Sequence, residues 1–149
     1  MLIVKYSIET KATPEAVWKV WADVDNWNTW DHGIDSSTIF GPFATGTRGK
    51  VKPKGAGEVH TLLTYVEPMK VFIDEAKLPF TRLIFTHTLS RSGKKTLVSH
   101  QIEMKGPLAL LFSYLIGRDL KKNLPREMSA MIRKAEGIVI EQDRLENHH

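Results

Sequence analysis

The chain of 149 residues contains no cysteine, so neither a disulfide framework nor a thiolate metal site can form. A long hydrophobic run is also missing. The longest one begins at Leu108 and reaches Ile116 with Ser113 inside it, well short of the roughly 20 apolar residues that span a bilayer. The first residues lack the charged start and apolar core of a secretion signal. We therefore expect a cytoplasmic protein that does not insert stably into membranes.

Charge is neither strongly of one sign nor concentrated in runs. Lysine and arginine total 21 against 17 aspartate and glutamate, a formal net charge of +4. The densest basic groups lie at 48–54 and 118–126, and no nucleic-acid-binding motif accompanies them. We expect a solvated basic surface and no nucleic-acid partner. Lys121 to Arg126 leave one weaker alternative open, a protein-interaction or membrane-surface module.

Internal repeats and long linkers rich in proline, glycine or serine are absent as well, and this predicts a single domain over 1–144. The remaining residues, 145–149, read Leu-Glu-Asn-His-His. They resemble the remnant of an expression tag, so we set them apart as a tail. His148 and His149 are excluded from the reasoning about functional sites.

A long amphipathic segment is the main feature that is present. From Gly106 to Asp143, apolar residues recur three or four positions apart, which predicts one long helix with a single apolar stripe. Pro125 lies inside this segment and is expected to kink the helix. Such a kink would let the first half close over a cavity while the second half packs tightly.

The preceding residues alternate between apolar and polar types in short stretches divided by turn residues, which predicts antiparallel strands. The helix-start sequence Thr13-Pro14-Glu15 predicts a short helix, and a second short one runs through Trp27 and Trp30. The fold class is thus α+β: a curved antiparallel sheet of about seven strands around a long C-terminal helix, with two short helices between the first and second strands. The predicted strands are 2–9, 34–40, 48–52, 58–66, 69–75, 80–89 and 96–104.

In this order, the motifs at 12–18, 23–31, 46–49, 85–89, 98–100 and 106–109 resemble the START-like, helix-grip (SRPBCC) superfamily. The resemblance is to its polyketide cyclase/dehydrase and lipid-transport branch. It implies a sheet that grips the long helix and a small apolar molecule held between them, such as a lipid, a sterol or a polyketide. Some members cyclise or dehydrate their ligand. No catalytic signature in this chain selects a named enzyme, because one fold hosts many activities.

Two histidines stand on the more apolar face of the hairpin formed by 80–104. A turn centred on Ser92-Gly93 would place Phe85 opposite His100 and His87 opposite Val98. The two imidazoles would then be diagonal neighbours, roughly 5–8 Å apart between Cβ atoms. Asp74 is a candidate carboxylate partner for either ring.

These histidines have two interpretations. Each can be a structural residue that is hydrogen-bonded in the core, or each can present polar atoms to a ligand. In the second case they are also the candidate catalytic acid and base. A metal site is not expected, because no third ligand can be placed, and no cofactor is implied.

Our leading hypothesis is a binding or carrier protein for a small apolar molecule. The alternative is a cyclase or dehydratase of polyketide-like substrates that uses His87 and His100. The sequence leaves open whether any reaction is catalysed, and it does not indicate an oligomeric state. Ordinary core packing explains each aromatic wall residue equally well. The predicted ligand-binding residues are Trp30, Tyr65, Phe72, Phe85, His87, His100, Leu108, Phe112 and Leu115.

Overall fold

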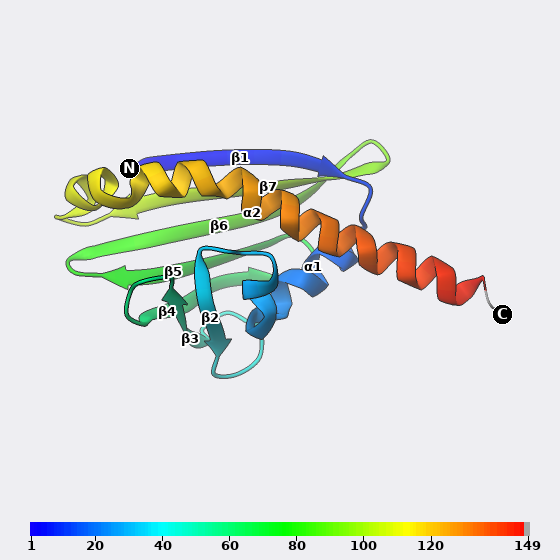
Figure 1. The fold of residues 1–149 in the computed structure, drawn as a ribbon, viewed down its shortest axis with the longest axis horizontal. Helices are drawn as coiled ribbons and strands as arrows, with labels where there is room; N and C mark the ends of the chain where they lie inside the picture. The colour runs from blue at the N-terminus through cyan, green and yellow to red at the C-terminus, as the bar shows by residue number, and fades with distance from the viewer. Residues whose placement is uncertain (148–149) are drawn as a thin grey trace.

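Seven antiparallel strands form one curved sheet in the order β1-β7-β6-β5-β4-β3-β2, and one long helix runs along its inner side (Figure 1). The structure is a computed structural model that describes residues 1–147. The predicted α+β class and element order are confirmed. The elements are β1 Leu2–Thr10, α1 Pro14–Ala22, the 3-10 helix η1 Val24–Thr29, β2 Ile34–Ile39, β3 Arg48–Pro53, β4 Val59–Glu67, β5 Val71–Leu78, β6 Thr81–Ser92, β7 Lys95–Lys105 and α2 Ala109–Glu146.

The two short helices plug one end of the trough, as we call the concave inner face of the sheet. The Thr13 side chain caps α1 by accepting a hydrogen bond from the Ala16 amide at 3.1 Å, and Pro14 occupies the first turn, where its missing N–H costs nothing. The second predicted helix is the short 3-10 helix η1. The Trp27 indole N–H donates to the Trp21 carbonyl at 2.9 Å, which fixes η1 against α1.

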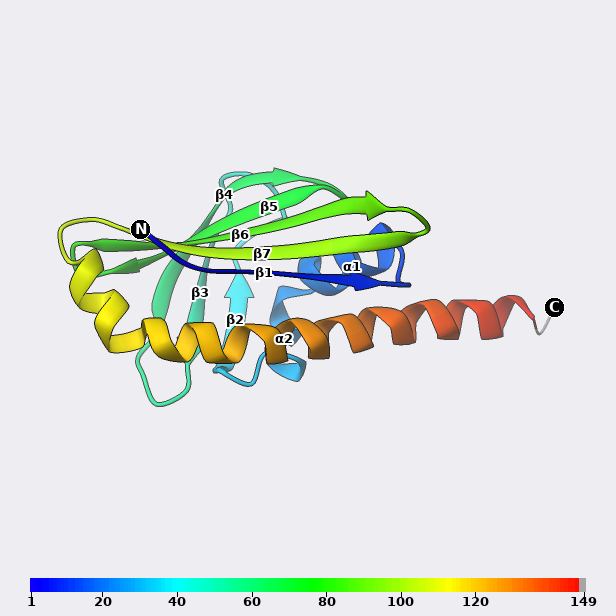
Figure 2. The same ribbon diagram turned by 90° about the horizontal axis from the view of Figure 1, so that it is seen from above.

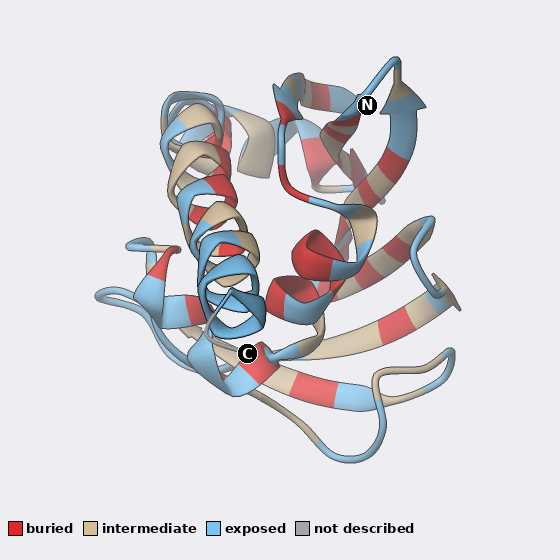
Figure 3. Ribbon diagram, turned by 90° about the vertical axis from the view of Figure 1, so that its right-hand side faces the viewer, coloured by how far each residue is buried: buried red, intermediate tan, exposed pale blue. Residues whose placement is uncertain are grey.

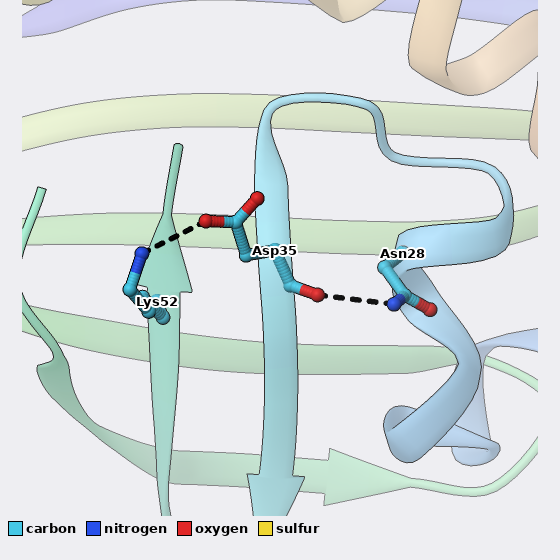
Figure 4. Close-up of polar contacts among 3 residues, drawn as sticks. All are labelled: Asn28, Asp35 and Lys52. Atoms are coloured by element: carbon cyan, nitrogen blue, oxygen red, sulfur yellow. Dashed lines mark hydrogen bonds and ion pairs between the residues drawn. The ribbon is translucent and has the colours of Figure 1, made fainter. Parts of the chain in front are cut away.

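The edge strand β2 is held from both sides by polar contacts (Figure 4). The Asn28 side chain of η1 donates to the Asp35 carbonyl at 3.0 Å. The Lys52 ammonium of β3 lies 2.8 Å from the Asp35 carboxylate, and its hydrogen bond lowers the pKa of Asp35. The contact with η1 partly covers this edge of the sheet, which would otherwise be open to pairing with a strand of another chain.

Helix α2 is continuous through Pro125. Seen from above, the first turns of α2 lie at an angle to the rest (Figure 2), so the visible change of direction comes earlier than the expected kink. Gly117 is buried where α2 passes β1, and a Cβ placed on it would lie 3.7 Å from Ile3 Cγ2. The helix also extends to Glu146, into the segment 145–149 that was predicted to be a tail; positions 148 and 149 lie outside the described residues. No helix among residues 1–147 is long and apolar enough to cross a membrane.

Burial changes along the inner stripe of α2. Between Leu124 and Ala135 the stripe is fully buried, and Figure 3 shows buried stretches of α1 and α2 facing the inside of the curved sheet. In its first half the stripe is only half-buried. The trough is therefore tightly packed along one part of α2 and loosely packed along the other. The buried set is Leu124, Met128, Met131, Ile132 and Ala135, and the half-buried set is Phe112, Ile116 and Leu120.

Replacing Gly49 by alanine should destabilise the fold, because β2 and β3 approach each other too closely there for a side chain. A Cβ at Gly49 would lie 2.4 Å from the Thr38 carbonyl oxygen. We expect Gly49→Ala to lower the free energy of unfolding by about 1–3 kcal/mol in urea titrations. Gly57→Ala is the matched control, since nothing lies within 4 Å of its Cβ position. Equal stability of the two variants would contradict this explanation.

Candidate functional site

A row of four aromatic or imidazole side chains crosses the trough on adjacent strands. Phe72 of β5 lies opposite His87 of β6, which lies opposite His100 of β7, which lies opposite Tyr6 of β1. The two histidines are therefore direct cross-strand partners rather than diagonal neighbours. The predicted register was wrong because the hairpin turns at Gly93 and Lys94, with Ser92 opposite Lys95. Each residue of β6 thus pairs with a residue of β7 two positions away from the predicted one. Because side chains alternate between faces, both histidines still lie on the predicted face of the sheet.

Three of these rings lie in contact, and one of the two contacts is a parallel stack. The centroids of Phe72 and His87 lie 3.8 Å apart with an interplanar angle of 7°, and those of His87 and His100 lie 3.9 Å apart at 37°. The Trp21 ring of α1 meets the His87 ring edge-on at 5.5 Å. Trp18 also packs edge-on against Phe72, at 6.2 Å. The tryptophans of α1 thus cover the Phe72 and His87 end of the row and leave His100 less covered.

Three buried polar atoms in this cluster have no hydrogen-bond partner among the described residues. They are Asp74 Oδ1, His87 Nδ1 and His100 Nε2. Asp74 Oδ1 and His87 Nδ1 lie 3.7 Å apart, which is too far for a hydrogen bond. A buried polar group without a partner costs about 1–3 kcal/mol. Their concentration in one place makes this cluster the candidate site.

Burial controls the charges of this cluster. It raises the pKa of Asp74 to about 7 and lowers the pKa of His100 to about 3. The pKa of His87 lies well below its usual value because of burial and the neighbouring His100. Near neutral pH both imidazoles are therefore uncharged and Asp74 is partly protonated. Although Asp74 and His87 lie within ion-pair distance, the His87 imidazole is uncharged, so the two side chains form no ion pair.

The other predicted wall residues divide into two groups. Phe85 and Phe112 are half-buried, and the Phe85 ring lies 6.1 Å from that of His100. Leu108 is also half-buried, at the start of α2. Trp30 is buried against Trp27 with a ring separation of 6.1 Å, and its indole nitrogen has no partner. These four side chains remain candidates for contact with a ligand.

Tyr65 and Leu115 do not belong to this group. The register of β4 shifts between Leu63 and Tyr65, and this bulge turns Tyr65 to the outer face, where its hydroxyl donates to the Glu67 carboxylate at 3.1 Å. Tyr65 is 46% exposed. Leu115 is exposed as well, because Ile116 occupies the inner stripe of α2 at that level.

Some residues of the site could not be assigned from the sequence. Tyr6 enters the row only because β1 pairs with β7, and Ile116 and Leu120 continue the half-buried stripe of α2. The available signals for these residues were the alternation of apolar and polar residues in β1 and the spacing of apolar residues in α2. Trp21 was not among the predicted wall residues, although its ring contacts that of His87.

Two surface hollows are described, with volumes of about 440 and 420 Å³. Neither is lined by a predicted wall residue. The first lies beside the β5–β6 turn and the second beside Pro125. In the trough itself, Phe85, His100 and the inner side chains of the first half of α2 are only partly buried. Among residues 1–147, no group of three or more His, Asp or Glu side chains is placed to hold a metal ion.

A second pair of ionisable groups joins α2 to the loop after η1. Asp31 and Glu127 share a hydrogen bond, and burial together with the neighbouring Asp31 raises the pKa of Glu127 to about 9. Burial also raises the pKa of Asp31. One proton is therefore held between the two carboxyl groups near neutral pH. In any measurement of stability against pH, the contribution of this carboxyl pair has to be distinguished from that of His100.

Replacing His100 by glutamine should make the fold less sensitive to acid. The folded pKa of His100, about 3, lies below its ordinary value of 6.5. As pH falls between these values the unfolded state takes up a proton that the folded state refuses, so stability is lost. Wild type should lose up to about 1.4 kcal/mol per pH unit relative to His100→Gln in urea titrations. The difference between the two curves cancels contributions from Asp31, Asp74 and Glu127.

The exposed His60 supplies the control. His60→Gln should follow the wild-type curve, because that side chain lies at the surface. Parallel curves for wild type and His100→Gln over the same range would show that the His100 imidazole is not held neutral by burial.

Comparison with known proteins places this geometry among helix-grip structures. The di-domain ARO/CYC protein StfQ from the steffimycin biosynthetic pathway matches with a TM-score of 0.77 at 8% identity, over 93% of this chain and 52% of that one. This chain thus spans about half the length of StfQ. The Zhui aromatase/cyclase of a Streptomyces species matches with a TM-score of 0.67 at 13% identity, over 91% and 94% of the two chains.

A norcoclaurine synthase variant of Thalictrum flavum also matches, with a TM-score of 0.67 at 15% identity over 94% of each chain. At these identities the likeness shows the fold alone. No curated protein matches the sequence. The family described as polyketide cyclase/dehydrase and lipid transport matches residues 1–136, and the chain belongs to that family.

Proposed function

We propose that this protein binds a small, mainly apolar and uncharged molecule in the open part of the trough. The observation that carries the proposal is the cluster of three buried polar atoms without partners, on Asp74, His87 and His100. These atoms lie on a face that is otherwise apolar. A ligand with one or two polar atoms would satisfy them and bury its apolar remainder against the sheet and α2.

The packing of α2 supports this position for the ligand. Phe112, Ile116 and Leu120 face the trough but are only half-buried, and so are Phe85 and His100 across from them. A packed core would bury both sides. From Leu124 to Ala135 the helix does bury its stripe, whereas the part before Leu124 is packed more loosely.

The charge state of the cluster favours a neutral polar group on the ligand. A neutral imidazole offers one donor and one acceptor, and a protonated carboxyl group also offers both. A carbonyl or a phenolic hydroxyl would suit this set. A charged group would be costly because the cluster is buried and carries no fixed opposite charge. Polyketide-like molecules, sterols and lipids with a hydroxyl group meet these conditions, and the family description and the aromatase/cyclase relatives agree with them.

A cyclase or dehydratase is the second candidate, and the placement of Asp74 favours it. The imidazoles have pKa values too low to be protonated acids near neutral pH. Asp74, with a pKa of about 7, is better suited to give and take a proton. In this alternative Asp74 would transfer the proton and His87 would orient the substrate, which revises the roles expected from the sequence.

Ligand binding can be tested by thermal unfolding with naphthols as probes. At about 100 times Kd a ligand stabilises the folded state by about 2.7 kcal/mol, which is several degrees in Tm for a chain of this length. Ile116→Trp should abolish the shift, because the larger ring fills the open part of the trough. Ile140→Trp is the control, on an exposed position of the same helix.

The absence of a shift with naphthols, sterols and fatty alcohols alike would overturn the binding proposal. An equal shift in the Ile116→Trp variant would move the site elsewhere. To separate the two candidates, linear polyketones are incubated with wild type and with Asp74→Asn. A cyclised product from wild type alone, with binding retained in both proteins, would establish the enzyme and replace the carrier interpretation.

A further inference from the structure

Exposed apolar side chains gather at one end of the molecule, which we call the apolar end. Phe80, Leu110 and Tyr114 are 78%, 72% and 84% exposed. They come from the β5–β6 turn and from the first turns of α2, which lie at the same end as the N-terminus (Figures 1 and 2). Exposed apolar groups concentrated in this way mark an interaction surface. The full set is Met1, Leu2, Phe80, Leu110, Leu111, Tyr114 and Leu115.

The backbone fixes these segments together. Gly106 has φ of +123°, and a Cβ there would lie 2.5 Å from the Phe80 carbonyl oxygen. The Leu108 amide donates to the same oxygen at 3.4 Å. Phe80 itself has φ of +49°, a conformation that is unfavourable for a bulky residue. Neither backbone preference nor burial accounts for a phenylalanine at this position, so its exposed ring needs another explanation.

Three basic residues lie opposite one another on the adjacent strands at this end, and we call them the basic rung. Lys77 of β5 faces Arg82 of β6, which faces Lys105 of β7. Like charges directly opposite each other destabilise a sheet. Arg82 lies 3.5 Å from Glu75, whereas neither Lys77 nor Lys105 forms an ion pair with any of residues 1–147.

The basic rung also lines a hollow of about 440 Å³ together with Phe80, Thr81 and Pro107. Thr81 is buried, and its hydroxyl has no hydrogen-bond partner. An anionic group in the hollow would relieve the repulsion between the three cations. Phosphate fits this chemistry well, because it accepts several charge-assisted hydrogen bonds.

The exposed face of α2 repeats this combination. Its apolar turns are followed at helical spacing by Arg118, Lys121 and Lys122, with Asp119 as the one acidic residue among them. All four are exposed or half-buried at most. The apolar end is thus bordered by cations on two sides. A helix with apolar and basic groups in this arrangement suits the interface of an anionic membrane.

We propose that the apolar end docks on a membrane that contains anionic phospholipids. Phe80, Leu110 and Tyr114 enter the interfacial region, and the basic rung binds lipid phosphate groups. Docking is peripheral, since no described helix is able to span the membrane. A second copy of the chain fits this surface less well, because a twofold contact would bring the two basic rungs together. The proposal does not depend on the ligand in the trough.

The test is sedimentation of the full chain with vesicles of phosphatidylcholine, with and without phosphatidylserine. Binding should require phosphatidylserine and weaken as salt is added. Lys77→Gln combined with Lys105→Gln should weaken binding about fivefold for each charge removed, from about 1 kcal/mol per lysine. Leu110→Gln combined with Tyr114→Gln should weaken it more than tenfold, because both side chains leave the interface.

Two controls match these variants. Ile140→Gln changes a residue of α2 that is 67% exposed outside the apolar end, and Lys94→Gln with Lys95→Gln removes two exposed charges from the β6–β7 turn. Both should bind like wild type. Failure of wild type to bind phosphatidylserine vesicles at low salt would overturn the proposal, and so would equal losses in the controls.

Two further measurements distinguish a membrane from the other possible partners of the apolar end, a soluble anion and a second copy of the chain. Glycerophosphoserine, the free headgroup, should not displace the protein from vesicles at concentrations comparable to the lipid. If the free headgroup displaced the protein completely, and if the variant Leu110→Gln with Tyr114→Gln bound vesicles normally, the basic rung would be a site for a soluble anion. That result would refute docking. In sedimentation velocity without lipid, the wild-type protein should be a monomer. A dimer that disappears in the variant Leu110→Gln with Tyr114→Gln would assign the apolar end to a second copy of the chain and refute membrane docking.

Discussion

The concave face of the sheet is wider than one helix can cover. The packing of the molecule depends on which side chains cover the area that α2 leaves. The tryptophans of α1 and η1 cover the end around Phe72, where three of them approach one phenylalanine ring. The inner stripe of α2 from Leu124 to Ala135 is fully buried. Between these two packed regions the sheet presents His100 and Phe85 only half-covered. The position of the candidate site is thus a consequence of incomplete coverage.

The polar groups in that uncovered region oppose stability. One polar atom on each of Asp74, His87 and His100 loses its hydration and gains no partner, and burial shifts the pKa of each group toward its neutral form. Replacing them by apolar residues of similar volume would make a more stable core. Their presence is therefore better explained by what they can contact than by what they contribute to folding. This reasoning separates them from the buried tryptophans, for which packing is a sufficient explanation.

Much of the fold could be predicted from the sequence, because periodicity and turn residues are local signals. The pairing of successive strands from β2 to β7 and the long C-terminal helix both follow from them, whereas the pairing of β1 with β7 joins distant segments. The register of the β6–β7 hairpin could not be fixed, since either Ser92-Gly93 or Gly93-Lys94 suits a tight turn, and only the structure decides for the second. The histidine face was nevertheless right, because the error moved each partner by an even number of residues.

The errors in the site have similar causes. Tyr65 was placed inside because regular alternation from Leu63 puts it there, and a bulge in one strand is not visible in a single sequence. The neutral state of the histidines depends on burial by α1 and on each other, which are long-range contacts. The role of Asp74 could only be suggested from the sequence, since its pKa depends on the same burial.

Pro125 gives α2 a mechanical property that its continuous ribbon does not suggest. Proline has no N–H, so the Lys121 carbonyl lacks the usual hydrogen bond to the residue four positions later. This missing bond falls between Leu120, which is half-buried, and Leu124, which is fully buried. Bending stiffness is therefore lowest where the packing changes. We therefore expect the part of α2 before Pro125 to bend more readily than the part after it, which the buried residues from Leu124 to Ala135 hold in place.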